Sequence, residues 1–195
     1  MLRTRLLASL ALVAVVAAMP STLRADDEGH ANLIGKPAPN IKLDFATNGK
    51  ATSLEDLKGK VVLVDFWAVW CGPCVACFPH LRDWDSKYKS KGLEVVGVTN
   101  YYKQYEFQNG KLARAKQPLS AKQEQSMLKK FAEHHKLKYT LGTVTDRNVM
   151  NSYGVRGIPQ MVVIDRKGNI RMVKVGSGEE NAKAIEDEIK KLLAE

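Results

Sequence analysis

The chain has 195 residues, of which 45% are hydrophobic and 26% charged, and its formal net charge is +9. A chain of this length and composition is expected to form one domain with an ordinary hydrophobic core, which excludes a multi-domain architecture. The excess of lysine and arginine would suit nucleic acid, but no nucleic-acid-binding motif accompanies it. We favour a basic solvent-exposed face or a docking site for an acidic partner, and expect no nucleic acid partner.

The first 25 residues have the pattern of a secretory signal peptide. Arg3 and Arg5 precede an uncharged stretch at 6–19, and a polar segment then ends near Ala25. The uncharged stretch is shorter than the about 20 residues that span a bilayer, so an uncleaved membrane anchor is the weaker alternative. Removal of residues 1–25 takes away three arginines and no acids, which lowers the formal charge from +9 to +6. We therefore expect an exported protein, periplasmic or otherwise extracytoplasmic, with a flexible leader at 26–33 and a single domain at 34–195.

The segment before residue 70 predicts three elements. Apolar and polar residues alternate over 41–45 and an Asn-Gly pair follows at 48–49, which predicts an N-terminal β-hairpin. Ser53 and Asp56 have the spacing of a helix cap, so a short helix is expected directly after Ser53. The apolar run at 61–67 lacks alternation, as expected of a strand that is covered on both faces in the middle of a sheet.

The remainder of the chain alternates between helical and strand patterns. Ser120 and Ser177 are each followed three residues later by Gln or Glu, which is the pattern of a capping box at a helix start. In chain order we predict a helix from Cys71 that contains Pro79, a strand at 93–99, an insertion loop at about 101–120 without clear periodicity, a helix from Ser120 to about Leu137, a strand at 139–144, a short helix at 147–153, a hairpin with strands at 161–165 and 170–175, and a final helix after Ser177.

Positive charge is concentrated in one segment, residues 103–138. The segment holds nine lysines and arginines against three glutamates, so it carries +6, which equals the formal charge expected of the chain without its first 25 residues. We expect this segment to form a basic surface outside the core fold, which would serve for docking if it is used at all.

Two cysteines three residues apart, Cys71 and Cys74, follow the predicted central strand at the point where a helix would begin. The first helical turn has unpaired backbone N–H groups and the positive end of the helix dipole, which together stabilise a thiolate. Cys71 is therefore the expected nucleophile. Cys74 lies almost one turn further on, close enough to form a small disulfide ring and shielded enough to stay protonated until it is needed.

Metal-binding interpretations of the cysteines are weaker. Cys71, Cys74 and Cys77 have the opening spacing of a bacterial ferredoxin cluster, but Leu81 stands where the fourth ligand would be. A zinc site that adds His80 is conceivable, although ligands within about ten residues on one helix could hardly surround a metal tetrahedrally. We expect no metal and no cofactor.

The order of the predicted elements, with a Cys-x-x-Cys helix early and a Gly-Ile-Pro segment before a hairpin far downstream, resembles the thioredoxin fold. More narrowly, residues 33–193 resemble the exported TlpA/ResA-like thiol:disulfide oxidoreductases of that superfamily. The matching motifs are Gly35-Lys36-Pro37-Ala38-Pro39, the segment from Leu54 to Val62, Phe66-Trp67-Ala68, Trp70-Cys71-Gly72-Pro73-Cys74 with Pro79, and Tyr153-Gly154-Val155 with Gly157-Ile158-Pro159 running into Val163-Ile164-Asp165. The resemblance implies an α/β fold with a central mixed β-sheet flanked by helices, an N-terminal hairpin extension and the insertion before the second main helix.

The resemblance also implies a substrate site and partners. The Ile158–Pro159 bond is expected to be cis and to lie against the dithiol, where the backbone of Ile158 could pair with an extended substrate. The expected substrate-binding residues are Trp70, Gly72, Pro73, Ile158 and Pro159. Disulfide-bearing proteins are the expected substrates, and a membrane thiol electron donor is the expected source of reducing equivalents.

Two residues depart from what their surroundings predict. Asp65 is a carboxylate within the apolar strand, and its functional interpretation is a proton acceptor for Cys74. The alternative is an edge carboxylate that reaches solvent.

Cys77 stands where the family commonly carries Glu, so a mechanism that uses that acid cannot be transferred to this chain. A buried thiol that packs as a small hydrophobic group is the favoured interpretation of Cys77, and a third redox thiol is the alternative.

Together these features predict an exported thiol:disulfide oxidoreductase that acts as a reductase. The Gly-Pro pair between the cysteines resembles the reducing thioredoxins, with potentials near about −270 mV, rather than strong oxidants near about −120 mV. A thiol peroxidase is the rival enzyme, although Ala68 stands where its usual Thr would precede the reactive cysteine. A copper-binding chaperone of thioredoxin fold is the rival non-enzyme, although it would need a wider cysteine spacing and a distant histidine.

Overall fold

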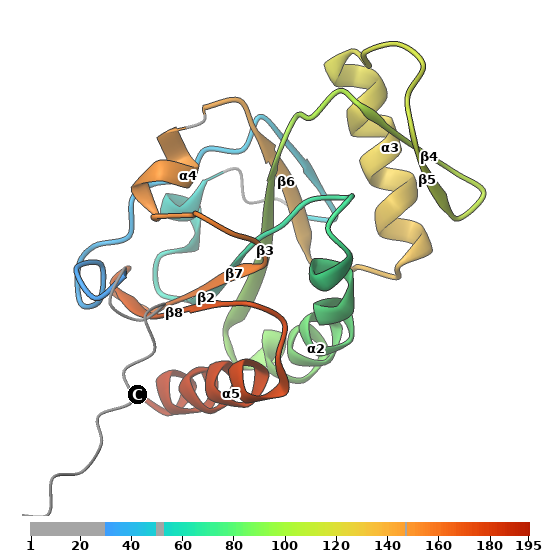
Figure 1. Ribbon diagram of the computed structural model, residues 1–195. Helices are drawn as coiled ribbons and strands as arrows, with labels where there is room; N and C mark the ends of the chain where they lie inside the picture. The colour runs from blue at the N-terminus through green and yellow to red at the C-terminus, as the bar shows by residue number, and fades with distance from the viewer. Residues whose placement is uncertain (1–29, 50–52, 147) are drawn as a thin grey trace, which may run out of the picture.

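The computed structural model describes residues 30–49, 53–146 and 148–195. Its main sheet has six strands in the order β1–β6–β3–β2–β7–β8 (Figure 1). The strands are β1 Phe45–Thr47, β2 Val61–Phe66, β3 Leu93–Asn100, β6 Thr140–Val144, β7 Gln160–Ile164 and β8 Ile170–Val175. The pairs β2–β3 and β3–β6 are parallel, and the other neighbouring pairs are antiparallel. The predicted mixed sheet of an α/β fold is confirmed.

Hydrophobic side chains pack on both faces of this sheet. The long helices α2 (Gly72–Tyr88), α3 (Ala121–His134) and α5 (Glu179–Ala194) form one core with Val61 and Leu63 of β2. The short helices η1 (Leu54–Leu57) and α4 (Asn148–Ser152) form the other core with Val62, Val64 and Phe66, and η2 (Lys89–Lys91) follows α2. Figure 1 shows α2 and α5 on one side of the sheet and α4 on the other. All six residues of β2 are buried, so the prediction of a central strand covered on both faces is correct.

The insertion is not the irregular loop that we predicted. Residues 105–108 and 111–114 form an antiparallel hairpin, β4 (Tyr105–Gln108) and β5 (Lys111–Arg114), which lies against α3. Asn109 and Gly110 at its turn both have positive φ angles, 51° and 76°, as a two-residue hairpin turn requires. Phe107 is the one residue that these two strands bury, so the sequence shows no clear alternation of apolar and polar residues there. The hairpin is held instead by a contact with a distant segment, that of Phe107 with Phe131 of α3.

Two smaller predictions about the ends of elements also need correction. The strand before the turn at 48–49 pairs with β6, and across the turn the described residues form one isolated bridge, between Lys42 and Ser53, in place of a regular hairpin. The helix α5 begins after Gly178 instead of Ser177, and Asn181 Nδ2 in its first turn donates to the carbonyl of Val175. The other caps are as predicted.

The predicted signal peptide, residues 1–25, lies outside the described residues. Of the predicted leader at 26–33, residues 30–33 are described and form a turn, in which His30 is buried and its Nε2 lies 3.0 Å from the carbonyl oxygen of Gly154. Among the described residues, every helix is too short or too polar to cross a membrane.

Candidate active site

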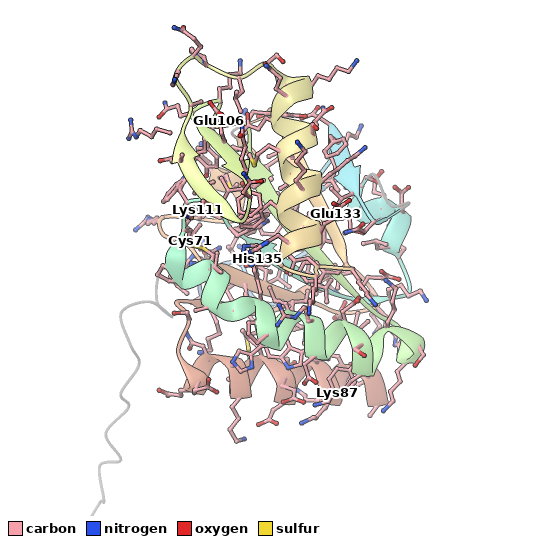
Figure 2. All side chains as sticks on the ribbon, turned by 90° about the vertical axis from the view of Figure 1, so that its right-hand side faces the viewer. Cys71, Lys87, Glu106, Lys111, Glu133 and His135 are labelled. Carbon is pink, nitrogen blue, oxygen red and sulfur yellow. A yellow bond between two sulfur atoms is a disulfide. The ribbon has the colours of Figure 1, made fainter. Side chains whose placement is uncertain are left out.

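A disulfide between Cys71 and Cys74 lies at the N-terminus of α2. Cys71 is the N-cap residue, and its Sγ accepts a hydrogen bond of 3.1 Å from the backbone N–H of Cys74. Pro73 stands in the first turn of the helix, where the missing N–H of proline leaves no donor unpaired. Both sulfur-bearing side chains are buried, whereas Gly72 and Pro73 between them are exposed. Figure 2 shows Cys71 at the start of α2, below the hairpin of β4 and β5.

The connection between β2 and α2 is anchored in the core. The backbone N–H of Trp67 donates to Val98 of the neighbouring strand, and that of Cys71 donates to Ala68 within the turn. The Trp67 ring is fully buried and stacks on Phe131 with 5.4 Å between ring centroids. This anchoring fixes the position of Cys71 and leaves Trp70 at the surface with 43% of its area exposed.

The Ile158–Pro159 peptide bond is cis, as the resemblance implies. Pro159 directly precedes β7, and the first residue of that strand, Gln160, is opposite Phe66 at the end of β2. Because α2 begins shortly after Phe66, Ile158 and Pro159 lie at the end of the sheet where the disulfide is. Pro159 is buried and Ile158 half-buried. The structure thus brings the predicted substrate-binding residues of both segments to one end of the sheet.

Asp65 is buried completely, which contradicts the alternative of an edge carboxylate that reaches solvent. Neither carboxylate oxygen has a hydrogen-bond partner among the described residues. Burial raises the pKa of Asp65 to about 7, because a carboxylate loses its hydration in an apolar surrounding. Side chains alternate along a strand, so Asp65 faces the same side as Val61 and Leu63, which is the side that α2 covers.

Cys77 is a free, buried thiol one turn beyond Cys74 in α2. Its Sγ donates to the carbonyl of Pro73 at 3.5 Å. Burial raises the pKa of Cys77 to about 12, and the negative charge of Asp65 adds to the shift. Its burial confirms the prediction of a buried thiol, and a thiol with this pKa stays protonated at neutral pH.

The zinc alternative required His80 as a ligand, but His80 contacts other residues. His80 Nε2 is 3.3 Å from a carboxylate oxygen of Glu179, and its ring stacks on Trp84. In the part of the chain that the structure describes, no three His, Cys, Asp or Glu side chains are grouped so that they could hold a metal ion.

Sequence reasoning missed an aromatic surface beside the disulfide. The ring of Trp70 contacts Tyr102 edge-on, with 5.5 Å between centroids, and Tyr105 lies 6.5 Å from Trp70. Tyr102 follows β3 and Tyr105 begins β4, so both belong to the insertion. A buried carboxylate, Glu124, accepts the backbone N–H of Tyr102 at 2.7 Å and that of Lys103 at 3.0 Å. The presence of Tyr102 and Tyr105 in the insertion was the one sequence feature that pointed to this surface. No local pattern indicated that their rings lie against Trp70.

A disulfide at the N-cap of the helix after a central strand, with a cis proline at the same end of the sheet, defines a thioredoxin-fold protein with a Cys-x-x-Cys redox centre. The model of the Redoxin family matches residues 33–192. The chain belongs to the Redoxin family.

Curated relatives bear the name thiol-disulfide oxidoreductase ResA. The relative from Bacillus thuringiensis strain Al Hakam is 30% identical over 159 residues, which cover 82% of this chain and 78% of the relative. The relative from Bacillus subtilis strain 168 is 31% identical over 153 residues, which cover 78% of this chain and 72% of the relative.

Solved structures show the same fold. A crystal structure from Chlorobium tepidum, provisionally named thiol:disulfide interchange protein DsbE, has a TM-score of 0.63 and 32% sequence identity, over 82% of this chain and 97% of the other. The thioredoxin domain of a thiol-disulfide oxidoreductase from Bacteroides vulgatus has a TM-score of 0.60 and 26% identity, over 80% of this chain and 97% of the other. The protein is therefore a thiol-disulfide oxidoreductase of the thioredoxin superfamily, as predicted.

Proposed function

We propose that the protein is an exported reductase of protein disulfides, in which Cys71 is the nucleophile and Cys74 the resolving thiol. The observation that carries this assignment is the position of Cys71 at the N-cap of α2, where the N–H of Cys74 donates to its sulfur. An N–H group and the positive end of a 17-residue helix both stabilise a negative charge on that sulfur. Cys74 is fully buried, and among the described residues no N–H group donates to its sulfur.

The reaction begins from the reduced dithiol. The Cys71 thiolate attacks one sulfur of the substrate disulfide, a Cys71–substrate disulfide forms, and the other substrate cysteine leaves as a thiolate that takes up a proton from water. Cys74 then loses its proton and attacks the Cys71 sulfur of the mixed disulfide. The Cys71–Cys74 disulfide forms, and the second substrate cysteine leaves. Two electrons pass from the dithiol to the substrate.

We assign the proton acceptor for Cys74 to Asp65. Resolution of the mixed disulfide requires a base that is buried near Cys74. This base should have no charged partner, and its pKa should lie near the working pH. Asp65 is buried beneath α2, its oxygens have no hydrogen-bond partner among the described residues, and its pKa is raised to about 7. At neutral pH a large fraction of Asp65 is therefore ionised and able to accept a proton.

The substrate is held around the exposed rim of the disulfide. Trp70, Gly72 and Pro73 are exposed next to Cys71, and Ile158 and Pro159 lie at the same end of the sheet. An extended substrate segment would pair with the backbone at Ile158, as an added strand does at a sheet edge.

Reduction is the favoured direction because the cysteines enclose Gly-Pro, as in thioredoxins with potentials near about −270 mV. Each turnover leaves the Cys71–Cys74 disulfide, so an exported reductase needs a source of electrons outside the cytoplasm. A membrane thiol protein is the donor that we propose.

The direction and the location can be tested together. The midpoint potential of the purified dithiol should lie near about −270 mV in a glutathione or dithiothreitol titration, and the protein recovered from the extracytoplasmic fraction should begin near residue 26. In those cells, trapping of free thiols should find the Cys71–Cys74 pair mostly reduced. A midpoint potential near about −120 mV would instead indicate that the protein oxidises dithiols in its substrates. Recovery of the chain from the cytoplasm with its first 25 residues intact would reject export.

A further inference from the structure

The insertion brings aromatic side chains to the rim of the disulfide. We call Trp70, Tyr102 and Tyr105 the aromatic platform. Trp70 is exposed and both tyrosines are half-buried, so the platform presents ring surface to solvent directly beside Cys71. Tyrosine and tryptophan combine a large apolar area with few rotatable bonds, which is why they anchor protein interfaces.

The platform is held in place from below. Glu124 is buried on α3 and accepts the N–H groups of Tyr102 and Lys103, where the chain turns with a positive φ of 59° at Lys103. The N–H of Leu119 donates to the carbonyl of Lys103, which ties the start of the insertion to its end. A surface fixed in this way loses little conformational entropy when a partner binds.

Exposed positive charge borders the platform. Arg114 of β5 is directly opposite Tyr105 of β4, and residues opposite each other in a ladder share a face of the sheet. Lys103 directly follows Tyr102, and both cations are exposed. Glu106 projects from the opposite face of the hairpin, because side chains alternate, and it accepts a hydrogen bond from Gln108.

Acidic groups near the platform are few. Glu124 is buried and directs both oxygens to backbone N–H groups. Asp44 is exposed and lines a pocket of about 540 Å³ together with Lys103, and the charge of Glu124 also acts on Lys103, so these two carboxylates offset part of the charge of that lysine. Among these groups the exposed side chains are two cations and one carboxylate, so the exposed charge is positive, in line with the excess of nine cations over three glutamates at 103–138.

We propose that the insertion selects substrates: the aromatic platform and its two cations dock protein disulfides whose flanking segment carries acidic residues and an aromatic residue. The proposal rests on the proposed reductase function and names the substrate class of that site. The partner's acidic groups pair with Lys103 and Arg114, and its aromatic ring packs against Trp70 and Tyr105 while Cys71 attacks the adjacent disulfide.

The test compares two synthetic peptides of equal length, each with one internal disulfide and one tyrosine. The acidic peptide has Asp and Glu beside the cysteines, and the basic peptide has Lys at the same positions. The reduced protein is mixed with each peptide, and each rate is divided by the rate of the same peptide with dithiothreitol, which corrects for intrinsic disulfide reactivity. We expect the acidic peptide to be favoured by about tenfold in 0.01 M salt. The preference should shrink as salt rises, because the screening length falls from about 30 Å at 0.01 M to about 10 Å at 0.1 M.

Charge-reversed variants identify the cations. Lys103→Glu combined with Arg114→Glu should remove or reverse the preference. The matched control is Lys136→Glu combined with Lys138→Glu, which makes the same change in net charge at exposed lysines beside α2, away from the disulfide, and also replaces one lysine with a positive φ. The control should keep the preference. If both pairs of changes reduce it equally, the effect belongs to net charge and the platform has no selective role.

The aromatic contact is tested in the same assay. Replacing the tyrosine of the acidic peptide with alanine should lower its rate of reduction by the wild-type protein several-fold. The same replacement should lower the rate with the Tyr105→Ala variant much less, because this variant lacks the ring that the peptide tyrosine would contact. Equal losses in both proteins would reject the aromatic contact.

A small neutral disulfide, 2-hydroxyethyl disulfide, separates this proposal from the proposed function. If the protein reduces neither this compound nor either peptide, the reductase function fails. If it reduces the compound but treats the two peptides alike, reductase function stands and substrate selection by the insertion is rejected. Binding of the wild type to anionic phospholipid vesicles, lost in the Lys103→Glu and Arg114→Glu variant without any peptide preference, would assign the surface to membranes and overturn the proposal.

Discussion

Burial of the Cys77 thiol raises its pKa to about 12, and the charge of Asp65 on the strand beneath it contributes to this shift. Cys77 belongs to α2, and Asp65 belongs to β2 and faces the side of the sheet that α2 covers. A negative charge on either disfavours a negative charge on the other, so while Asp65 serves as the base for Cys74, Cys77 stays protonated.

The first prediction is that Cys77 takes no part in turnover. Cys77→Ala should keep activity with a protein disulfide within about twofold of wild type, with a loss of stability of about 1 kcal/mol for the smaller side chain. Iodoacetamide at pH 8 should label the folded, oxidised protein poorly and the unfolded protein fully, because the thiolate fraction is small when the pKa is about 12. A variant that folds normally but loses activity would make Cys77 a third redox thiol.

The second prediction concerns the order of the two cysteines. Cys74→Ser should accumulate substrates joined to Cys71, because attack proceeds and resolution cannot. Diagonal gels of cell extracts would display these adducts. Cys71→Ser combined with Cys74→Ser is the control and should yield none. Adducts that persist in this double variant, or that form through Cys74 in a Cys71→Ser protein at a similar rate, would reverse the assigned roles.

The third prediction concerns the stability of the fold at Asp65. Its folded pKa of about 7 lies above the ordinary value of about 3.9, so the folded state binds the proton more tightly than the unfolded state. The free energy of unfolding should therefore decline as pH rises from about 4 to about 7 and stay level above that. A shift of about three units corresponds to a decline of up to about 4 kcal/mol.

Asp65→Asn removes this titration. The difference in free energy of unfolding between the variant and wild type should move in favour of the variant between pH 4.5 and pH 8, as urea denaturation at both values would measure. A difference that does not change with pH would mean that Asp65 has an ordinary pKa in the folded protein.

The fourth prediction is kinetic. Asp65→Asn keeps the shape and removes the base, so the mixed disulfide should resolve at least about tenfold more slowly at pH 7. The deficit should shrink as pH rises, because hydroxide can then remove the Cys74 proton without the help of Asp65. Stopped-flow release of a fluorescent substrate thiol would give the rate. Resolution at the wild-type rate from pH 6 to pH 9 would make Asp65 structural.

The fifth prediction concerns the support of the aromatic platform. Glu124→Gln leaves one acceptor oxygen for two backbone N–H groups, so it should lower the free energy of unfolding by about 2 kcal/mol and loosen Tyr102. Trp67 and Trp84 are buried, so acrylamide quenching of fluorescence reports mainly on Trp70 and should increase. Glu133→Gln, at an exposed position of the same helix, is the matched control and should change neither value. Unchanged quenching in Glu124→Gln would separate Glu124 from the platform.

Predictions that rest on local signals agree with the structure. The apolar run at 61–67 is a central strand, and Ser120 caps α3 through its hydrogen bond from Gln123. Cys71 and Cys74 form a disulfide because residues three apart at the start of a helix are within covalent reach. Each of these features depends on side chains a few residues apart, so their spacing along the chain carries the information.

The sequence by itself determined the dithiol at a helix N-terminus, the central strand and the basic character of the insertion. It did not determine that β1 pairs with β6, that the insertion is a hairpin, or that Tyr102 and Tyr105 meet Trp70. The pairing of β1 with β6 and the contacts of Tyr102 and Tyr105 with Trp70 join residues more than 30 apart, and their free energy comes from burial that no local pattern records. The hairpin is local, but it buries only Phe107 and so shows no clear alternation. The interpretation of Asp65 was decided in the same way. Its place in an apolar strand raised the question, and only the packing of α2 over β2 showed that the carboxylate is removed from solvent.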